Sequence, residues 1–156
     1  MKRIKSKPEV WVFRMEAAEV DQLKHLVGNY PMTLSVPAKI SRTDTGDASR
    51  EREQLLEESL AAHRAELRQC AGFLMNDKHL KEMKTCWRLT LTHEEREILL
   101  QMMNDIRVGC WHALGKPEDL YALNAGHTAR HYAMVAFIHV AGFFEHHLID
   151  SEMEEG

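Results

Sequence analysis

The segment LTHEEREILLQMMNDIRVGCWHALG, residues 91–115, carries the strongest structural signals in the chain and predicts one long helix with clear ends. Thr92 is a suitable N-cap, and Glu95 three residues later completes a capping box. Gly115 stands where a left-handed C-cap residue is expected, and Pro117 cannot continue a helix. At about 100° per residue, apolar side chains cover roughly 220° of the helix, against about 100° on an ordinary surface helix. We therefore predict a core helix around which the rest of the chain packs.

Three polar residues, Asn104, Asp105 and Arg107, interrupt this predicted helix. Asn and Asp are poor residues in a helix interior because their side chains compete for backbone hydrogen bonds. Asn104 and Asp105 lie at opposite borders of the apolar arc. Arg107 projects inside the arc and needs either a carboxylate from another helix or a ligand. We expect an ion pair that fixes helix packing, and a contact with a ligand or partner through Arg107 is the alternative.

With MNDIRVGCWHALG at its centre, the chain resembles an uncharacterised bacterial family, the domain of unknown function numbered two-thousand-seventeen. Its members share a strand and helix, a polar gap, a long helix of mixed charge, a central helix with a Leu–Asn–Asp–x–Arg core, and an aromatic-rich last helix. The corresponding parts here are residues 10–27, 41–48, 49–76, 93–114 and 128–149. Met103 replaces the usual leucine, a change that conserves volume. The resemblance implies this fold and no particular activity, although some relatives are labelled regulatory.

Outside the central segment, periodicity and turn signals predict four further helices and two short strands. The strands are Val10–Phe13 and Trp87–Leu91, which we expect to pair as a two-stranded ribbon. The further helices are expected at residues 16–27, 49–76, 117–123 and 128–149. The predicted fold is mainly α-helical: a single-domain bundle of about five helices around a buried central helix, with a small N-terminal ribbon. It occupies residues 9–150, between a flexible basic arm at residues 1–8 and an acidic tail at residues 151–156.

Composition narrows the class of protein further. A chain of 156 residues is long enough for one domain with its own core. The net charge of −4 argues against a surface that binds nucleic acid broadly. The three cysteines have no CxxC spacing, which indicates small buried residues in a reducing compartment. The sequence shows neither a signal-peptide pattern nor about 20 consecutive apolar residues, so we expect a cytoplasmic protein and no membrane partner.

Ten histidines raise the question of a metal site, which their spacing addresses. His127 and His131 are four residues apart and could share a zinc ion on one helix face, and His146 could join Asp150. The sequence has neither an HExxH nor a Glu-x-x-His motif, and scattered histidines produce such pairs by chance. We keep these four residues as candidate ligands and expect no metal or other cofactor.

The residues favour binding over catalysis. The sequence has no nucleophile elbow and no glycine-rich phosphate loop. We expect a non-catalytic binding or regulatory protein that acts through protein–protein contacts, with another protein or with itself. A homodimer could form through helix 49–76, where apolar residues recur at heptad spacing, or through helix 128–149, which is apolar nearly all round. Two alternatives stay open: a metal-dependent enzyme or metal sensor using histidines of the last helix, and a DNA-associated regulator.

Overall fold

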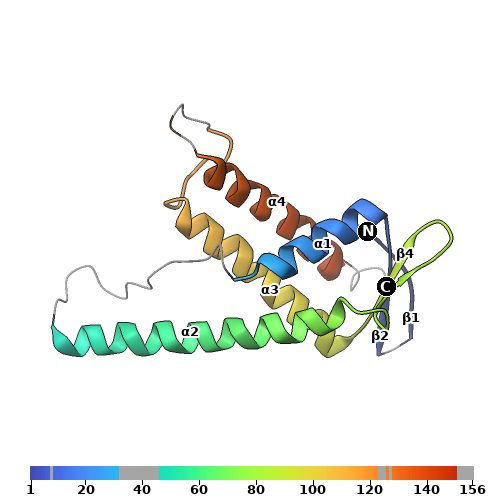
Figure 1. Cartoon of the computed structure of the whole chain (residues 1–156), viewed down its shortest axis with the longest axis horizontal. Coiled ribbons are helices and arrows are strands. Elements are labelled where there is room, and N and C mark those ends of the chain that lie inside the picture. Colours follow the sequence, from blue (N-terminus) through green and yellow to red (C-terminus); the bar gives the residue numbers. More distant parts are fainter. Residues whose placement is uncertain (8, 32–45, 123–125, 127, 151–156) are drawn as a thin grey trace.

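A computed structural model describes residues 1–7, 9–31, 46–122, 126 and 128–150, and this part of the chain forms four helices and a four-stranded antiparallel sheet (Figure 1). The elements are, in order, β1 (Lys2–Lys7), β2 (Val10–Met15), α1 (Ala17–Asn29), α2 (Asp47–Leu74), β3 (Leu80–Glu82), β4 (Trp87–Thr92), α3 (His93–Ala113) and α4 (Ala129–Asp150). The fold is therefore mixed α/β. The prediction of a mainly helical bundle of about five helices with a two-stranded ribbon is wrong.

The sheet has the strand order β1-β2-β4-β3, with β2 and β4 at its centre. Their antiparallel register places Val10 opposite Thr92 and Met15 opposite Trp87, so the predicted pairing of these two segments is confirmed. One further strand pairs with each outer edge of this two-stranded ribbon, β1 with β2 and β3 with β4. β1 comes from the stretch predicted to be a flexible basic arm, and β3 is only three residues long. Short or charged edge strands carry little apolar alternation, which is why the sequence pattern did not reveal them.

The short helix predicted at residues 117–123 is not formed by residues 117–122, and residue 123 lies outside the described part of the chain. Asp119 Oδ1 accepts a hydrogen bond from the backbone N–H of Tyr121 at 2.8 Å. An Asp side chain that bonds its own backbone two residues on forms a turn and competes with helix formation. The segment after α3 is therefore a series of turns.

Both ends of α3 have the predicted caps. Thr92 Oγ1 accepts the backbone N–H of Glu95 at 3.2 Å, and Glu95 Oε2 accepts the backbone N–H of Thr92 at 2.8 Å. At the other end Gly115 has φ +83°. The N–H of Gly115 donates to the carbonyl of His112 and that of Lys116 to the carbonyl of Trp111, each at 3.0 Å. This pair of bonds is the Schellman motif.

α3 is buried on most of its circumference, as its apolar arc predicts. It contacts β2, β4, α2 and α4. Its buried apolar side chains are those of Leu99, Met102, Met103, Ile106 and Cys110. Trp111, which the arc also included, is 38% exposed, and its indole N–H donates to the carbonyl of Pro117 at 3.0 Å. The buried arc is thus narrower than predicted, although α3 packs against four other elements.

Only the C-terminal half of α2 contributes apolar side chains to the core. Leu67, Ala71 and Leu74 in the C-terminal half are buried, in agreement with packing inside one chain. The N-terminal half projects beyond the other helices, at the end of the molecule away from the sheet (Figure 1). Leu55 is 66% exposed and Leu56 is 43% exposed there. The heptad pattern of this helix therefore continues past the surface that its own domain covers.

The negative charge of Glu95 is expected to stabilise the folded state, and this contribution is lost at acid pH. Burial acts to raise the pKa of its carboxyl, but hydrogen bonds from Thr92 and His79 outweigh burial and hold the pKa below its ordinary value. A lowered folded pKa gives stabilisation that is present above the ordinary pKa of about 4.3 and is lost as pH falls through the folded value. Glu95→Gln keeps the cap geometry and removes the charge. Urea unfolding should show a loss of about 0.5 kcal/mol near pH 7, and this loss should shrink as pH falls below the ordinary pKa. A loss of the same size at acid and at neutral pH would contradict this origin.

Candidate functional site

The signature residues of α3 take three different positions. Asp105 lies at the junction of three helices and accepts hydrogen bonds from the other two. Arg64 from α2 binds it with two hydrogen bonds, Nε to Oδ2 at 2.8 Å and a terminal nitrogen to Oδ1 at 3.0 Å. Tyr30, the C-cap of α1, donates its hydroxyl to Oδ2 at 2.7 Å. One carboxylate thus joins α1, α2 and α3.

The protonation states of this junction suit a structural role. Burial, together with the hydrogen bond to Asp105 and its charge, raises the pKa of Tyr30 far above its usual range. The phenol therefore stays a donor. Burial acts to lower the pKa of Arg64, but hydrogen bonds and charge from Asp105 outweigh it and raise the pKa. A charged guanidinium and a neutral phenol therefore both donate hydrogen bonds to the carboxylate of Asp105.

Arg107 pairs with a carboxylate from another helix, but on the surface. Its guanidinium forms an ion pair with Glu145 of α4, and its side chain is 45% exposed. A Cβ built on Gly142 would lie 3.6 Å from Nε of Arg107, so the arginine stem crosses α4 at this glycine. The expected ion pair between helices is present, while burial of Arg107 is not. Asn104 is exposed to solvent.

Sequence reasoning missed both partners of Asp105. Arg64 belongs to the charged faces of α2, and Tyr30 follows the end of α1. They lie 41 and 75 residues from Asp105 in the chain. The available signal was local: an Asp in a helix interior needs a partner, but its identity depends on the packing of two other helices.

The candidate metal ligands are not brought together. Nε2 of His146 and Oδ2 of Asp150 lie 2.8 Å apart and form an ion pair one helical turn apart on α4. His131 lies at the opposite end of α4, with its ring edge-on to that of Tyr132. His127 lies outside the described residues. Within the described ranges, no three His, Cys, Asp or Glu side chains are placed to hold a metal ion.

α4, one of the two helices predicted to form a dimer contact, has one buried face and one exposed face. Its inner face is buried through Met134, Ile138, Ala141, Phe144 and Leu148. The opposite face carries exposed residues at alternating spacings of four and three, which we call the α4 outer stripe: Tyr132, Ala136, His139, Phe143 and His146. Beside it, α1 and α4 border a shallow apolar groove of about 160 Å³ that includes Ala136, and in which His25 stacks on Phe137.

α4 also has the length and composition of a membrane-spanning helix. Its most apolar stretch has a mean hydropathy of 1.2, and 28% of that stretch is buried inside the protein. Core helices of soluble proteins meet the same criterion, so the finding is weak evidence for a membrane contact.

Comparisons with models of protein families, with curated proteins and with solved structures find no match. The likeness to the bacterial family of unknown function therefore stays a prediction.

Asp105→Asn should destabilise the protein strongly, although the two side chains have nearly the same size. The variant leaves the guanidinium of Arg64, only 12% exposed, without the charge that compensates it. Breaking a buried pair costs about 3–5 kcal/mol, and partial exposure of this pair reduces the expected loss to about 2 kcal/mol. Urea unfolding at neutral pH measures it. A loss below about 0.5 kcal/mol would show that the junction does not hold the helices together.

Arg107→Ala is the matched comparison on the same helix. Its ion pair with Glu145 is half exposed, and such pairs contribute about 0–1 kcal/mol. We expect a loss within that range, plus a small term for the stem that covers Gly142. Equal losses for Asp105→Asn and Arg107→Ala, measured side by side, would contradict the different positions of the two residues.

Proposed function

We propose that this protein is a non-catalytic binding protein that acts through protein–protein contacts, and that the α4 outer stripe binds a second copy of the chain. The observation that carries the proposal is the exposed stripe itself, in which Tyr132, Ala136 and Phe143 alternate with two histidines. Aromatic and apolar side chains at heptad spacing suit knobs-into-holes packing against another helix. Contiguous apolar surface on a folded domain commonly marks a contact site.

The stripe complements itself when two copies run antiparallel. With the two helices centred near residue 141, Ala136 of one copy faces His146 of the other, and His139 faces Phe143. Ala136, the one small residue of the stripe, then faces a larger side chain, which helps the two helices to interdigitate. Tyr132 faces Asp150, which places a hydroxyl donor opposite a carboxylate. A twofold arrangement of this kind makes every contact twice and closes the assembly as a dimer.

Ala136→Arg is expected to abolish self-association, because it places one charge in each half of the proposed interface and leaves the buried face of α4 untouched. Sedimentation or light scattering should show a dimer for the wild-type chain and a monomer for the variant. Ala62→Arg is the matched control: it makes the same change at an exposed position of α2. The control should remain dimeric, and thermal unfolding should show that both variants fold.

Three results would contradict the proposal. A wild-type monomer at high protein concentration would remove the second copy as partner. Loss of the dimer in Ala62→Arg, with Ala136→Arg unaffected, would move the interface to α2. Flotation of the wild-type chain with lipid vesicles, lost in Ala136→Arg, would assign the stripe to a membrane surface.

A further inference from the structure

Four cations lie side by side across the whole sheet. In the antiparallel register, Lys2 of β1 is opposite Arg14 of β2, Arg14 is opposite Arg88 of β4, and Arg88 is opposite Lys81 of β3. We call these four residues the cationic row. Neighbouring strands are about 4.8 Å apart, so the backbone positions of the four residues span roughly 14 Å.

The cationic row belongs to the solvent face of the sheet. One residue further along, the cross-strand set Phe13, Leu89 and Leu80 is fully buried, and side chains alternate between the two faces of a strand. Lys2, Arg14, Lys81 and, in part, Arg88 are accordingly exposed. The row is separate from the α4 outer stripe and makes no use of it.

Folding alone does not explain the cationic row. Like charges directly opposite one another destabilise a sheet. Among the residues that the structure describes, none of the ion pairs places a carboxylate on these four side chains. The one contact recorded for them is a hydrogen bond from Arg88 to the sulfur of Met83 at 3.6 Å. The repulsion is therefore left for something outside this part of the chain to compensate.

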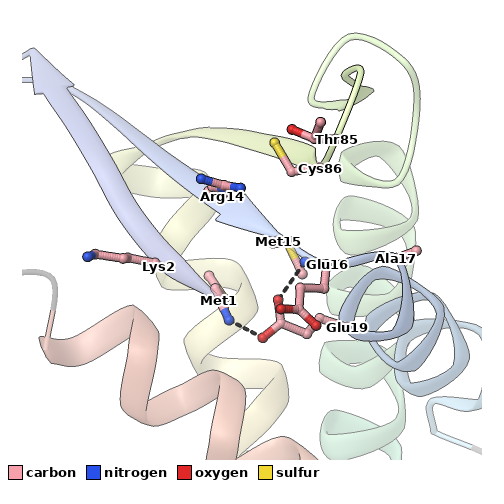
Figure 2. A pocket seen from close by; sticks show the side chains of 9 residues that line it. All are labelled: Met1, Lys2, Arg14, Met15, Glu16, Ala17, Glu19, Thr85 and Cys86. Carbon is pink, nitrogen blue, oxygen red and sulfur yellow. Dashed lines mark hydrogen bonds and ion pairs between the residues drawn. The ribbon is translucent and has the colours of Figure 1, made fainter.

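A pocket opens at the Lys2 and Arg14 end of the row, as Figure 2 shows. It measures about 480 Å³, within the range of small-molecule sites. β1 and β2 supply its basic side, and the hairpin before β4 supplies Cys86 and Thr85. The start of α1 supplies its acidic side through Glu16 and Glu19. Glu19 already accepts the backbone N–H of Glu16 at 2.8 Å and pairs with the amino group of Met1.

We propose that the cationic row and this pocket bind a small molecule that carries two or three linked phosphate groups. Linked phosphates concentrate several negative charges over a few ångströms, as the cationic row concentrates positive ones. The guanidiniums of Arg14 and Arg88, at its centre, suit bidentate contacts with phosphate oxygens. Glu16 repels phosphate, so the phosphates lie along the sheet. The uncharged part of the ligand lies in the pocket with hydroxyl or amino donors toward Glu16.

A nucleic acid fits these observations less well. Single-strand binding relies on aromatic side chains that stack with bases. Next along the solvent face, the central strands carry Val12 opposite Thr90, and neither offers a ring. The net charge of −4 also weakens attraction to a long polyanion. A pocket lined by Lys2 and Arg14, at one end of a row of four cations, points to a short ligand.

Calorimetric titration with inorganic tripolyphosphate and with adenosine triphosphate, at low salt and without divalent ions, tests the proposal. Both probes should bind the wild-type chain, and the nucleotide should bind more tightly because it also fills the pocket. Arg14→Gln should weaken binding of both about tenfold, the loss of one charge-assisted contact worth about 1.4 kcal/mol. Lys81→Gln, at the far end of the row, should weaken binding less. Arg52→Gln removes one positive charge from an exposed position of α2 and should leave binding unchanged.

Thermal unfolding separates binding from folding. Arg14→Gln relieves repulsion with two neighbours, so its midpoint without ligand should equal or exceed that of the wild-type chain. A lower midpoint for both Arg14→Gln and Lys81→Gln would assign the cationic row to folding and overturn the proposal. It is also overturned if neither phosphate probe binds, if Arg52→Gln weakens binding as much as Arg14→Gln does, or if only a single-stranded RNA homopolymer binds.

Discussion

The carboxylate of Asp105 accepts hydrogen bonds from a guanidinium of α2 and a phenol of α1, while its own helix is enclosed by the sheet and α4. A charge that is only 23% exposed is tolerated because both partners are present at the same time. The three helices must therefore meet in one arrangement. This constraint fixes the inner half of α2 against α3 and the C-terminal end of α1 beside them.

With the core fixed in this way, two surfaces are left that the fold itself does not explain. The α4 outer stripe exposes aromatic rings on a helix whose other side already fills the core. The cationic row places like charges opposite one another on three pairs of strands. One surface consists mainly of aromatic rings, and the other consists of basic side chains. They belong to different elements, so substitutions can separate their roles.

The sequence predicted what depends on local chemistry. The capping box at Thr92 and Glu95, the terminal Gly115, and the pairing of the strand at Val10 with the strand before α3 all rest on neighbouring residues or on strong alternation. The edge strands were not predicted because a strand of three residues, or one rich in lysine, has no apolar alternation. The partners of Asp105 and the members of the cationic row were not predicted for another reason. They come from separate elements, and only the packing and the register bring them together.

The projecting half of α2 has a consequence for how the molecule loses its structure. Between Asp47 and roughly His63 the helix is held mainly by its own backbone hydrogen bonds, because few of its side chains are buried. Helices without tertiary support are only marginally stable in water and fray from the end. Amide protons in this half should therefore exchange through local opening, well before those near Leu67 and Leu74. α2 is therefore one continuous helix whose amides should be well protected from exchange in its C-terminal half and poorly protected in its N-terminal half.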